Sequence, residues 1–177
     1  MKRIVLVLVL LGACRPRPIF DGADNPGWRV PSGYRKVVGA GWAIAVPGPW
    51  KTVRPRRPSS WVAQNAEPEG GVHSNVRLEA VRYAGDGRIF SKLRLEELRR
   101  SALVLGSRDT AMGALQARDV EAIWSRDSPP YHAVQRTFAT AGLGITLTCG
   151  GADAHFLRTR RTCALIFGSF RLMPDVF

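Results

Sequence analysis

Two segments near the end of the chain each place a cysteine on an apolar face. From residue 142 onward, apolar residues recur at every second position, which predicts a strand with one buried face formed by Leu143, Ile145, Leu147 and Cys149. Over residues 153–168, a helix is predicted from spacings of seven and four between Phe156, Cys163 and Phe167. If that helix packs on that strand face, the two sulfur atoms converge. We therefore expect an α+β fold in which the final helix covers a sheet.

The first residues have the order of a secretory signal. Lys2 and Arg3 precede an unbroken apolar run over residues 4–11, and Gly12 and Ala13 follow it. The β-branched residues of the run also suit a buried strand, but its place behind two cations at the N-terminus argues against one. The run is too short for a membrane-spanning helix, which needs about 20 apolar residues. We expect residues 1–13 to be a signal peptide.

The end of this segment, Leu11-Gly12-Ala13-Cys14, resembles a bacterial lipobox, the signal of a lipoprotein. The resemblance implies cleavage before Cys14 and attachment of lipid to its sulfur and new amino group. Residues 14–31 are rich in Arg, Pro, Gly and Asp and are expected to form a flexible tether to a membrane of the bacterial envelope. Arg15 is not the aspartate that favours inner-membrane retention in enteric bacteria, so we expect the outer membrane.

The cysteine count agrees with export. If Cys14 carries lipid, Cys149 and Cys163 remain as an even pair in an oxidising compartment, which favours a disulfide. The alternative is a catalytic thiol. Neither Cys-x-x-Cys nor His-x-x-x-His spacing occurs, so we expect no metal site and no cofactor.

The formal net charge is +12, a balance that often indicates nucleic acid or another anionic partner. Export makes nucleic acid a poor candidate and leaves anionic lipid head groups, acidic glycans or an acidic envelope protein. The strong preference for arginine over lysine has a second interpretation, the base composition of the genome. The proline-bounded loop that carries Arg54, Arg56 and Arg57 is the candidate partner contact, with a plain solvated loop as the alternative.

Hydrophobic periodicity predicts most of the remaining elements. We expect strands over residues 34–38, 42–46, 61–66, 76–83, 115–124 and 131–139, and a helix over residues 93–105 that ends at Gly106. Gly150 and Gly151 are expected to turn the chain between the last strand and the last helix. Trp50 is expected to pack back on the sheet.

Two stretches resemble the Mog1/PsbP-like superfamily. Residues 41–50, Gly-Trp-Ala-Ile-Ala-Val-Pro-Gly-Pro-Trp, are similar to its opening hairpin, and residues 131–138, 145–149 and 166–171 are similar to its closing strand pair and helix, which ends in Ser-Phe-Arg. The resemblance covers residues 34–172. It implies an antiparallel β-sheet sandwiched between helices, here as a single domain over residues 32–177. It implies no shared chemistry, so no active site carries over.

Candidate catalytic residues are few. His73, His132 and His155 are scattered, and a histidine paired with Asp153 could orient a base, but the sequence ties no nucleophile to it. Surface or turn positions are the alternative for these histidines. No hydrolase elbow, phosphate-binding loop or calcium-loop spacing occurs. The tryptophans indicate either a binding groove or core and rim packing: Trp28, Trp42, Trp50, Trp61 and Trp124.

These patterns favour a lipid-anchored envelope protein that acts as a non-catalytic binding or assembly module. The alternatives are a carrier or sensor of a small apolar or glycan ligand held between sheet and helix, and an unrecognised envelope enzyme. A closed core with a flat basic or apolar patch would favour the module. A tryptophan-lined cleft with perturbed histidines would favour a carrier or an enzyme. The oligomeric state stays open.

Overall fold

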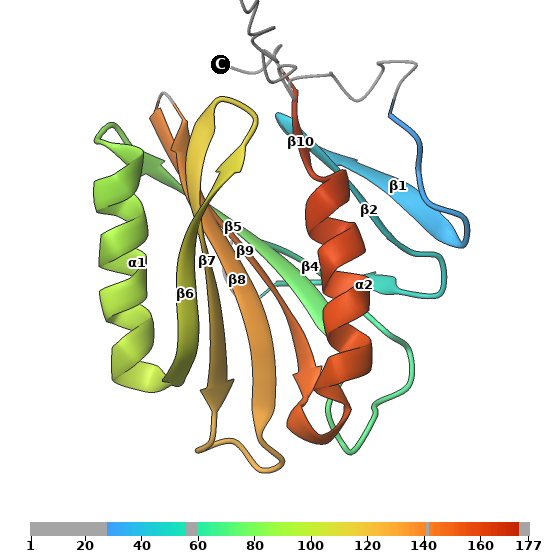
Figure 1. The fold of residues 1–177 in the computed structure, drawn as a ribbon. Helices are drawn as coiled ribbons and strands as arrows, with labels where there is room; N and C mark the ends of the chain where they lie inside the picture. Colours follow the sequence, from blue (N-terminus) through green and yellow to red (C-terminus); the bar gives the residue numbers. More distant parts are fainter. Residues whose placement is uncertain (1–27, 56–59, 141, 174–177) are drawn as a thin grey trace, which may run out of the picture.

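A computed structural model gives the fold, and it describes residues 28–55, 60–140 and 142–173. The signal, Cys14 and most of the expected tether lie outside these residues. The described residues form ten strands and two α-helices (Figure 1): β1 Tyr34–Gly39, β2 Trp42–Pro47, β3 Lys51–Val53, β4 Ser60–Gln64, β5 Asn75–Tyr83, α1 Gly87–Ser101, β6 Leu103–Met112, β7 Leu115–Trp124, β8 Tyr131–Thr140, β9 Gly142–Ala152, α2 Phe156–Ser169 and β10 Arg171–Leu172, with a 3-10 turn over Asp153–His155 before α2.

The strands form two antiparallel sheets. The large sheet has the order β3-β4-β5-β9-β8-β7-β6, and the small sheet has the order β1-β2-β10. Helix α1 packs across β7 and β8, whereas α2 packs across β9 and β8 and also contacts β2 of the small sheet. The predicted α+β architecture, an antiparallel sheet between helices, is confirmed (Figure 1).

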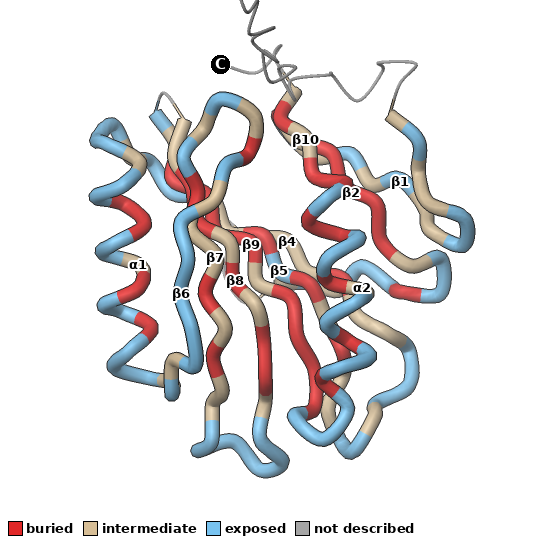
Figure 2. Tube along the Cα trace, viewed as in Figure 1, coloured by how far each residue is buried: buried red, intermediate tan, exposed pale blue. Residues whose placement is uncertain are grey.

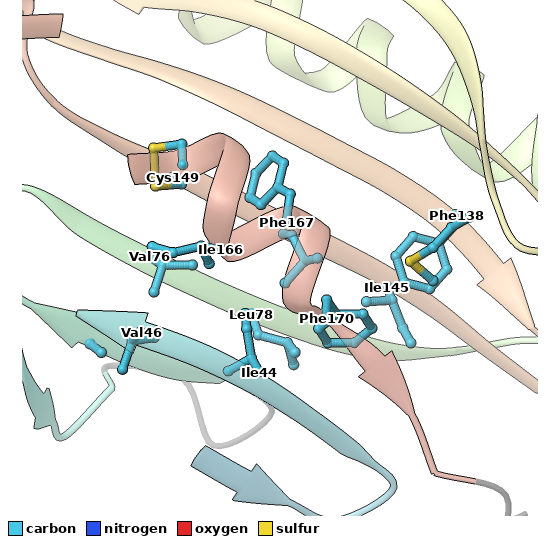
Figure 3. Close-up of a cluster of buried hydrophobic side chains, with 14 of the residues drawn as sticks. Ile44, Val46, Val76, Leu78, Phe138, Ile145, Cys149, Ile166, Phe167 and Phe170 are labelled. Carbon is cyan, nitrogen blue, oxygen red and sulfur yellow. A yellow bond between two sulfur atoms is a disulfide. The ribbon is translucent and has the colours of Figure 1, made fainter. Parts of the chain in front are cut away.

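Alternation along β9 separates the two faces of the large sheet. Ile145 and Leu147 belong to the main core with residues of α2 and β2, drawn in Figure 3. Gly144, the residue before Ile145, faces the ring of Phe90 on α1. The α2 face therefore carries the larger core, which Figure 2 shows as buried segments running along β9, β8 and α2.

A disulfide joins α2 to this face. The Cα atoms of Cys149 and Cys163 are 5.5 Å apart, and both residues are fully buried. The bond lies at the edge of the core cluster in Figure 3. It fixes the middle of α2 on β9.

A serine fixes the other end of α2 to the small sheet. Strand β10 pairs with β2 only through Ala43 and Trp42. Just before it, the hydroxyl oxygen of Ser169 accepts a hydrogen bond from the N–H of Ala45 at 2.9 Å, and the same hydroxyl lies 2.7 Å from the carbonyl oxygen of Ile166. Ser169 thus supplies a hydrogen-bond acceptor for a backbone N–H of β2 that lies beyond the two residues paired with β10.

The helix predicted over residues 93–105 is wrong at both ends. Helix α1 begins at Gly87, where the Asp86 carboxylate accepts hydrogen bonds from the N–H groups of Arg88 and Ile89. It ends at Ser101, and Leu103 and Leu105 lie exposed in β6, an edge strand that the sequence did not predict. The helical spacing in the sequence continued past Ser101 because leucines of the strand that follows directly happen to fit it.

The turn predicted at Gly150 and Gly151 is also wrong, because β9 continues to Ala152. A Cβ atom built on Gly150 would lie 2.3 Å from the carbonyl oxygen of His132 on β8. Glycine is therefore required for close approach of two strands and not for a turn. Strand β4 begins one residue before and ends two residues before the predicted range, and the three-residue β3 was not predicted.

Strand β6 carries one irregularity. Its register with β7 shifts between Val104 and Gly106, which leaves Leu105 as a bulge at the open edge of the large sheet. From Gly106 to Met112 the pairing with β7 is regular.

Candidate functional site

The two faces of the large sheet are covered unequally. Helix α1 lies over β7 and β8 and leaves the part formed by β4, β5 and β9 open on its own face. A cavity of about 640 Å³ results, which we call the α1-side groove. Its floor is formed by strand residues that include Val62, Arg77, Glu79, Tyr131, Gln135 and Thr148, its wall by Arg94, Glu97, Leu98 and Ser101 of α1, and its end by Trp124 and Asp127.

Strand alternation explains why polar side chains line this groove. On β5, Val76 and Leu78 point into the core, so Arg77 and Glu79 point to the α1 face. Gln135 of β8 and Thr148 of β9 are direct partners in the antiparallel register and share that face. The sequence contained this signal, since these polar residues alternate with the predicted core residues.

Gln135 is the most deeply buried polar side chain on the floor of the groove. The residue is only 7% exposed. In the part of the chain that the structure describes, its side-chain amide makes no hydrogen bond, although it lines the groove. An amide offers two donors and an acceptor, so Gln135 presents unused hydrogen-bonding capacity to the groove.

The charged side chains of the groove bind one another. The Arg94 guanidinium donates to the Glu79 carboxylate at 3.1 Å and to that of Glu97, while Arg77 lies 3.6 Å from Glu79. The groove holds two arginines and three carboxylates, including Asp127, and so has no excess positive charge in a chain of net charge +12. The Nε of Arg94 is buried and has no hydrogen-bond partner.

Tyr131 supplies a neutral hydroxyl. It donates a hydrogen bond to Asn75 Oδ1 at 3.1 Å. Burial raises the pKa of the Tyr131 phenol, and the nearby Arg77 and the hydrogen bond to Asn75 only partly oppose this. Its ring centroid lies 5.6 Å from that of Trp124, which forms the aromatic end of the groove.

A second polar cluster lies on the α2 face. His132 is 7% exposed, and its ring stacks on Phe156 with centroids 3.5 Å apart. Nδ1 lies 2.7 Å from Asp153 Oδ1, and Nε2 lies 3.1 Å from Glu121 Oε1. Asp153 therefore pairs with His132, whereas the sequence left its histidine partner open. The sequence did not indicate Glu121, which comes from the neighbouring strand β7.

This cluster is poorly suited to general base catalysis. Both ring nitrogens of His132 face carboxylates, so neither is free to take a proton from a substrate. Glu121 is also paired with Arg160 at 3.2 Å. The residues that line the adjacent pocket include no serine, threonine or cysteine. His73 lies elsewhere, 3.0 Å from the carbonyl oxygen of Asn65, and no group of metal-ligating residues occurs within residues 28–55, 60–140 and 142–173.

The other predicted contacts are dispersed. Arg54 is exposed after β3, but Arg56 and Arg57, like Cys14, lie outside the described residues, so the basic loop stays a prediction. Trp50 is buried, as predicted, in the main core. Trp42 and Trp61 pack against each other with centroids 5.2 Å apart, and of the tryptophans only Trp124 lines the groove. None of the described helices has the length and apolar character needed to span a bilayer.

Neither a protein-family model nor any curated protein matches the sequence. Solved structures are similar. The PsbP protein of the cyanobacterium Synechocystis sp. PCC 6803 has a TM-score of 0.59 at 11% identity, over 80% of this chain and 94% of that protein. PA94 of Pseudomonas aeruginosa has a TM-score of 0.57 at 11% identity, over 80% and 97%. LpqN of Mycobacterium tuberculosis, which is involved in cell envelope biogenesis, has a TM-score of 0.50 at 13% identity, over 83% and 82%. The chain therefore has a PsbP-like fold.

Proposed function

We propose that this protein is a lipid-anchored component of the bacterial envelope, at the outer membrane, and that it is a non-catalytic binding protein of the alternative kind considered from sequence, with a ligand held between the sheet and α1 in the α1-side groove. The groove carries the proposal, because it combines a cavity of about 640 Å³ with the Gln135 amide, which faces the cavity and makes no hydrogen bond within the described chain. Pockets of about 300–1,000 Å³ with a few convergent polar groups are typical of ligand sites.

Two further observations support this proposal. Both ring nitrogens of His132 contact carboxylates, which favours a structural role for this residue over proton transfer. The structurally similar LpqN is involved in cell envelope biogenesis, which agrees with the lipobox-like Leu11-Gly12-Ala13-Cys14 at the N-terminus.

The anchor is tested by fractionation. Two or three acyl chains hold a protein stably on a membrane, because each buried methylene contributes about 0.8 kcal/mol. Wild-type protein should carry the lipid mass and sediment with outer membranes, whereas Cys14→Ala should remain unprocessed or be released. Equal membrane partition of both proteins, with no lipid mass on the wild type, would contradict the anchor.

The binding role is tested by hydroxyl-radical footprinting of the full chain with and without a solubilised envelope fraction. We expect protection of Trp124, which lines the groove, and no protection of Trp28, which does not line it. The variant His132→Gln should show the same protection, because the cluster is structural. Equal labelling of Trp124 with and without envelope, or loss of protection in a stably folded His132→Gln, would overturn the proposal.

A further inference from the structure

We propose that the ligand of the α1-side groove is a neutral oligosaccharide. This inference rests on the proposed function, which makes the groove a binding site, and it assigns the chemical class of the occupant.

The hydrogen-bonding groups of the groove match hydroxyl groups. The Gln135 amide donates and accepts, and the Thr148 hydroxyl beside it does both. The Gln135 amide faces the groove and makes no hydrogen bond within the described chain, so its donors and its acceptor can bond a ligand without breaking a protein contact. Sugar hydroxyls both donate and accept, which allows one ligand to satisfy the amide and the hydroxyl together.

Charge disfavours an anionic ligand. Arg94 is held by Glu79 and Glu97, and the groove as a whole has more carboxylates than arginines. The remaining positive charge of the chain lies outside this groove, so an acidic glycan would gain little there.

An aromatic ring is placed at the end of the polar floor. Trp124 lines the groove and packs against Tyr131, which holds the indole in a fixed orientation. The C–H faces of pyranose rings pack on flat aromatic rings, while their hydroxyl edges seek hydrogen bonds. The groove offers both kinds of surface within one cavity.

The test is isothermal titration of the full chain, held in a detergent without a sugar head group. The probes are triacetylchitotriose and maltotriose as neutral trisaccharides, and trigalacturonate as an anionic one. We expect binding of at least one neutral probe and weaker or no binding of trigalacturonate. Gln135→Leu and Thr148→Val should each weaken binding roughly two- to tenfold, the loss expected for a hydrogen bond.

Thr110→Val is the matched control, because Thr110 is also a half-buried strand threonine. It belongs to β6, where it lies opposite Ala117 of β7, and it does not line the groove. It should leave affinity unchanged, and melting curves verify that each variant is folded. Absence of binding by both neutral probes at millimolar concentration, tighter binding of trigalacturonate, or no effect of the two groove variants overturns the inference. If Trp124 is protected by the envelope fraction while neither neutral probe competes, the binding module stands and only the oligosaccharide is refuted.

Discussion

Removal of the disulfide should lower the free energy of unfolding by an amount that depends on the length of chain between the two cysteines. Cys149 and Cys163 are 14 residues apart in sequence and fully buried in the main core. Cross-linking a loop of about 15 residues restricts the unfolded chain by about 3 kcal/mol on the chain-entropy model. A typical domain has a free energy of unfolding of about 5–15 kcal/mol, so the loss is a large share of the total.

The perturbation is Cys149→Ala, Cys163→Ala and the double variant, measured by thermal and urea denaturation. For a domain of this size, about 3 kcal/mol corresponds to a fall in Tm of roughly 6–12 °C. Because either substitution breaks the same bond, the double variant should be little less stable than each single one. The Tm of the wild-type protein should fall by a similar amount when a reducing agent breaks the disulfide.

Cys14→Ala is the matched control, since it removes a cysteine that forms no part of this bond and should leave the Tm unchanged. A loss of less than about 1 kcal/mol of unfolding free energy in each single variant would refute stabilisation by the cross-link. Losses that add in the double variant would refute it too, because they would indicate two independent packing effects and not one cross-link.

Three other changes probe separate contacts. Ser169→Ala should cost about 1–3 kcal/mol of unfolding free energy, since it leaves the buried N–H of Ala45 without its partner, and urea denaturation against Ser169→Thr measures this. Gly144→Ala should cost about 1–3 kcal/mol, because a Cβ there would lie 2.4 Å from the buried ring of Phe90; an unchanged Tm would show that the ring moves freely. Since burial raises the folded-state pKa of Tyr131 and the unfolded chain loses its proton first, stability should fall as pH rises above about 10, and Tyr131→Phe should reduce that slope in pH-dependent denaturation.

The sequence predicted the fold well where a local pattern and the tertiary environment agree. The strand that ends near Cys149 and the helix around Cys163 were visible because each has one apolar face buried against the other. The helix start at Asp86 was missed because the surrounding glycines indicated a break after a strand, whereas the Asp86 carboxylate caps a helix there. Strand β6 was missed because its exposed leucines continued the helical spacing and its face is largely solvated.

The groove was beyond prediction for a different reason. Alternation shows that Gln135 and Thr148 lie on the face opposite the main core, but it does not show which strands a helix leaves uncovered. That depends on where α1 crosses the sheet, which Phe90 against Gly144 and Ser91 against the backbone of Thr137 determine. A histidine paired with Asp153 was considered from sequence, but the identity of that histidine as His132 and the addition of Glu121 depend on strand pairing.

The bulge at Leu105 bears on how copies of the protein behave when crowded together. An exposed edge strand offers unpaired backbone groups to any other strand, and β6 is ten residues long with exposed Leu103 and Leu105. The shift in register between Val104 and Gly106 bends this apolar end away from a regular edge, while Arg108 and Asp109 place charge on the regular part. An irregular, partly charged edge is a feature by which sheet proteins oppose edge-to-edge pairing between copies, so the bulge at Leu105 bears on association as well as on the fold of one chain.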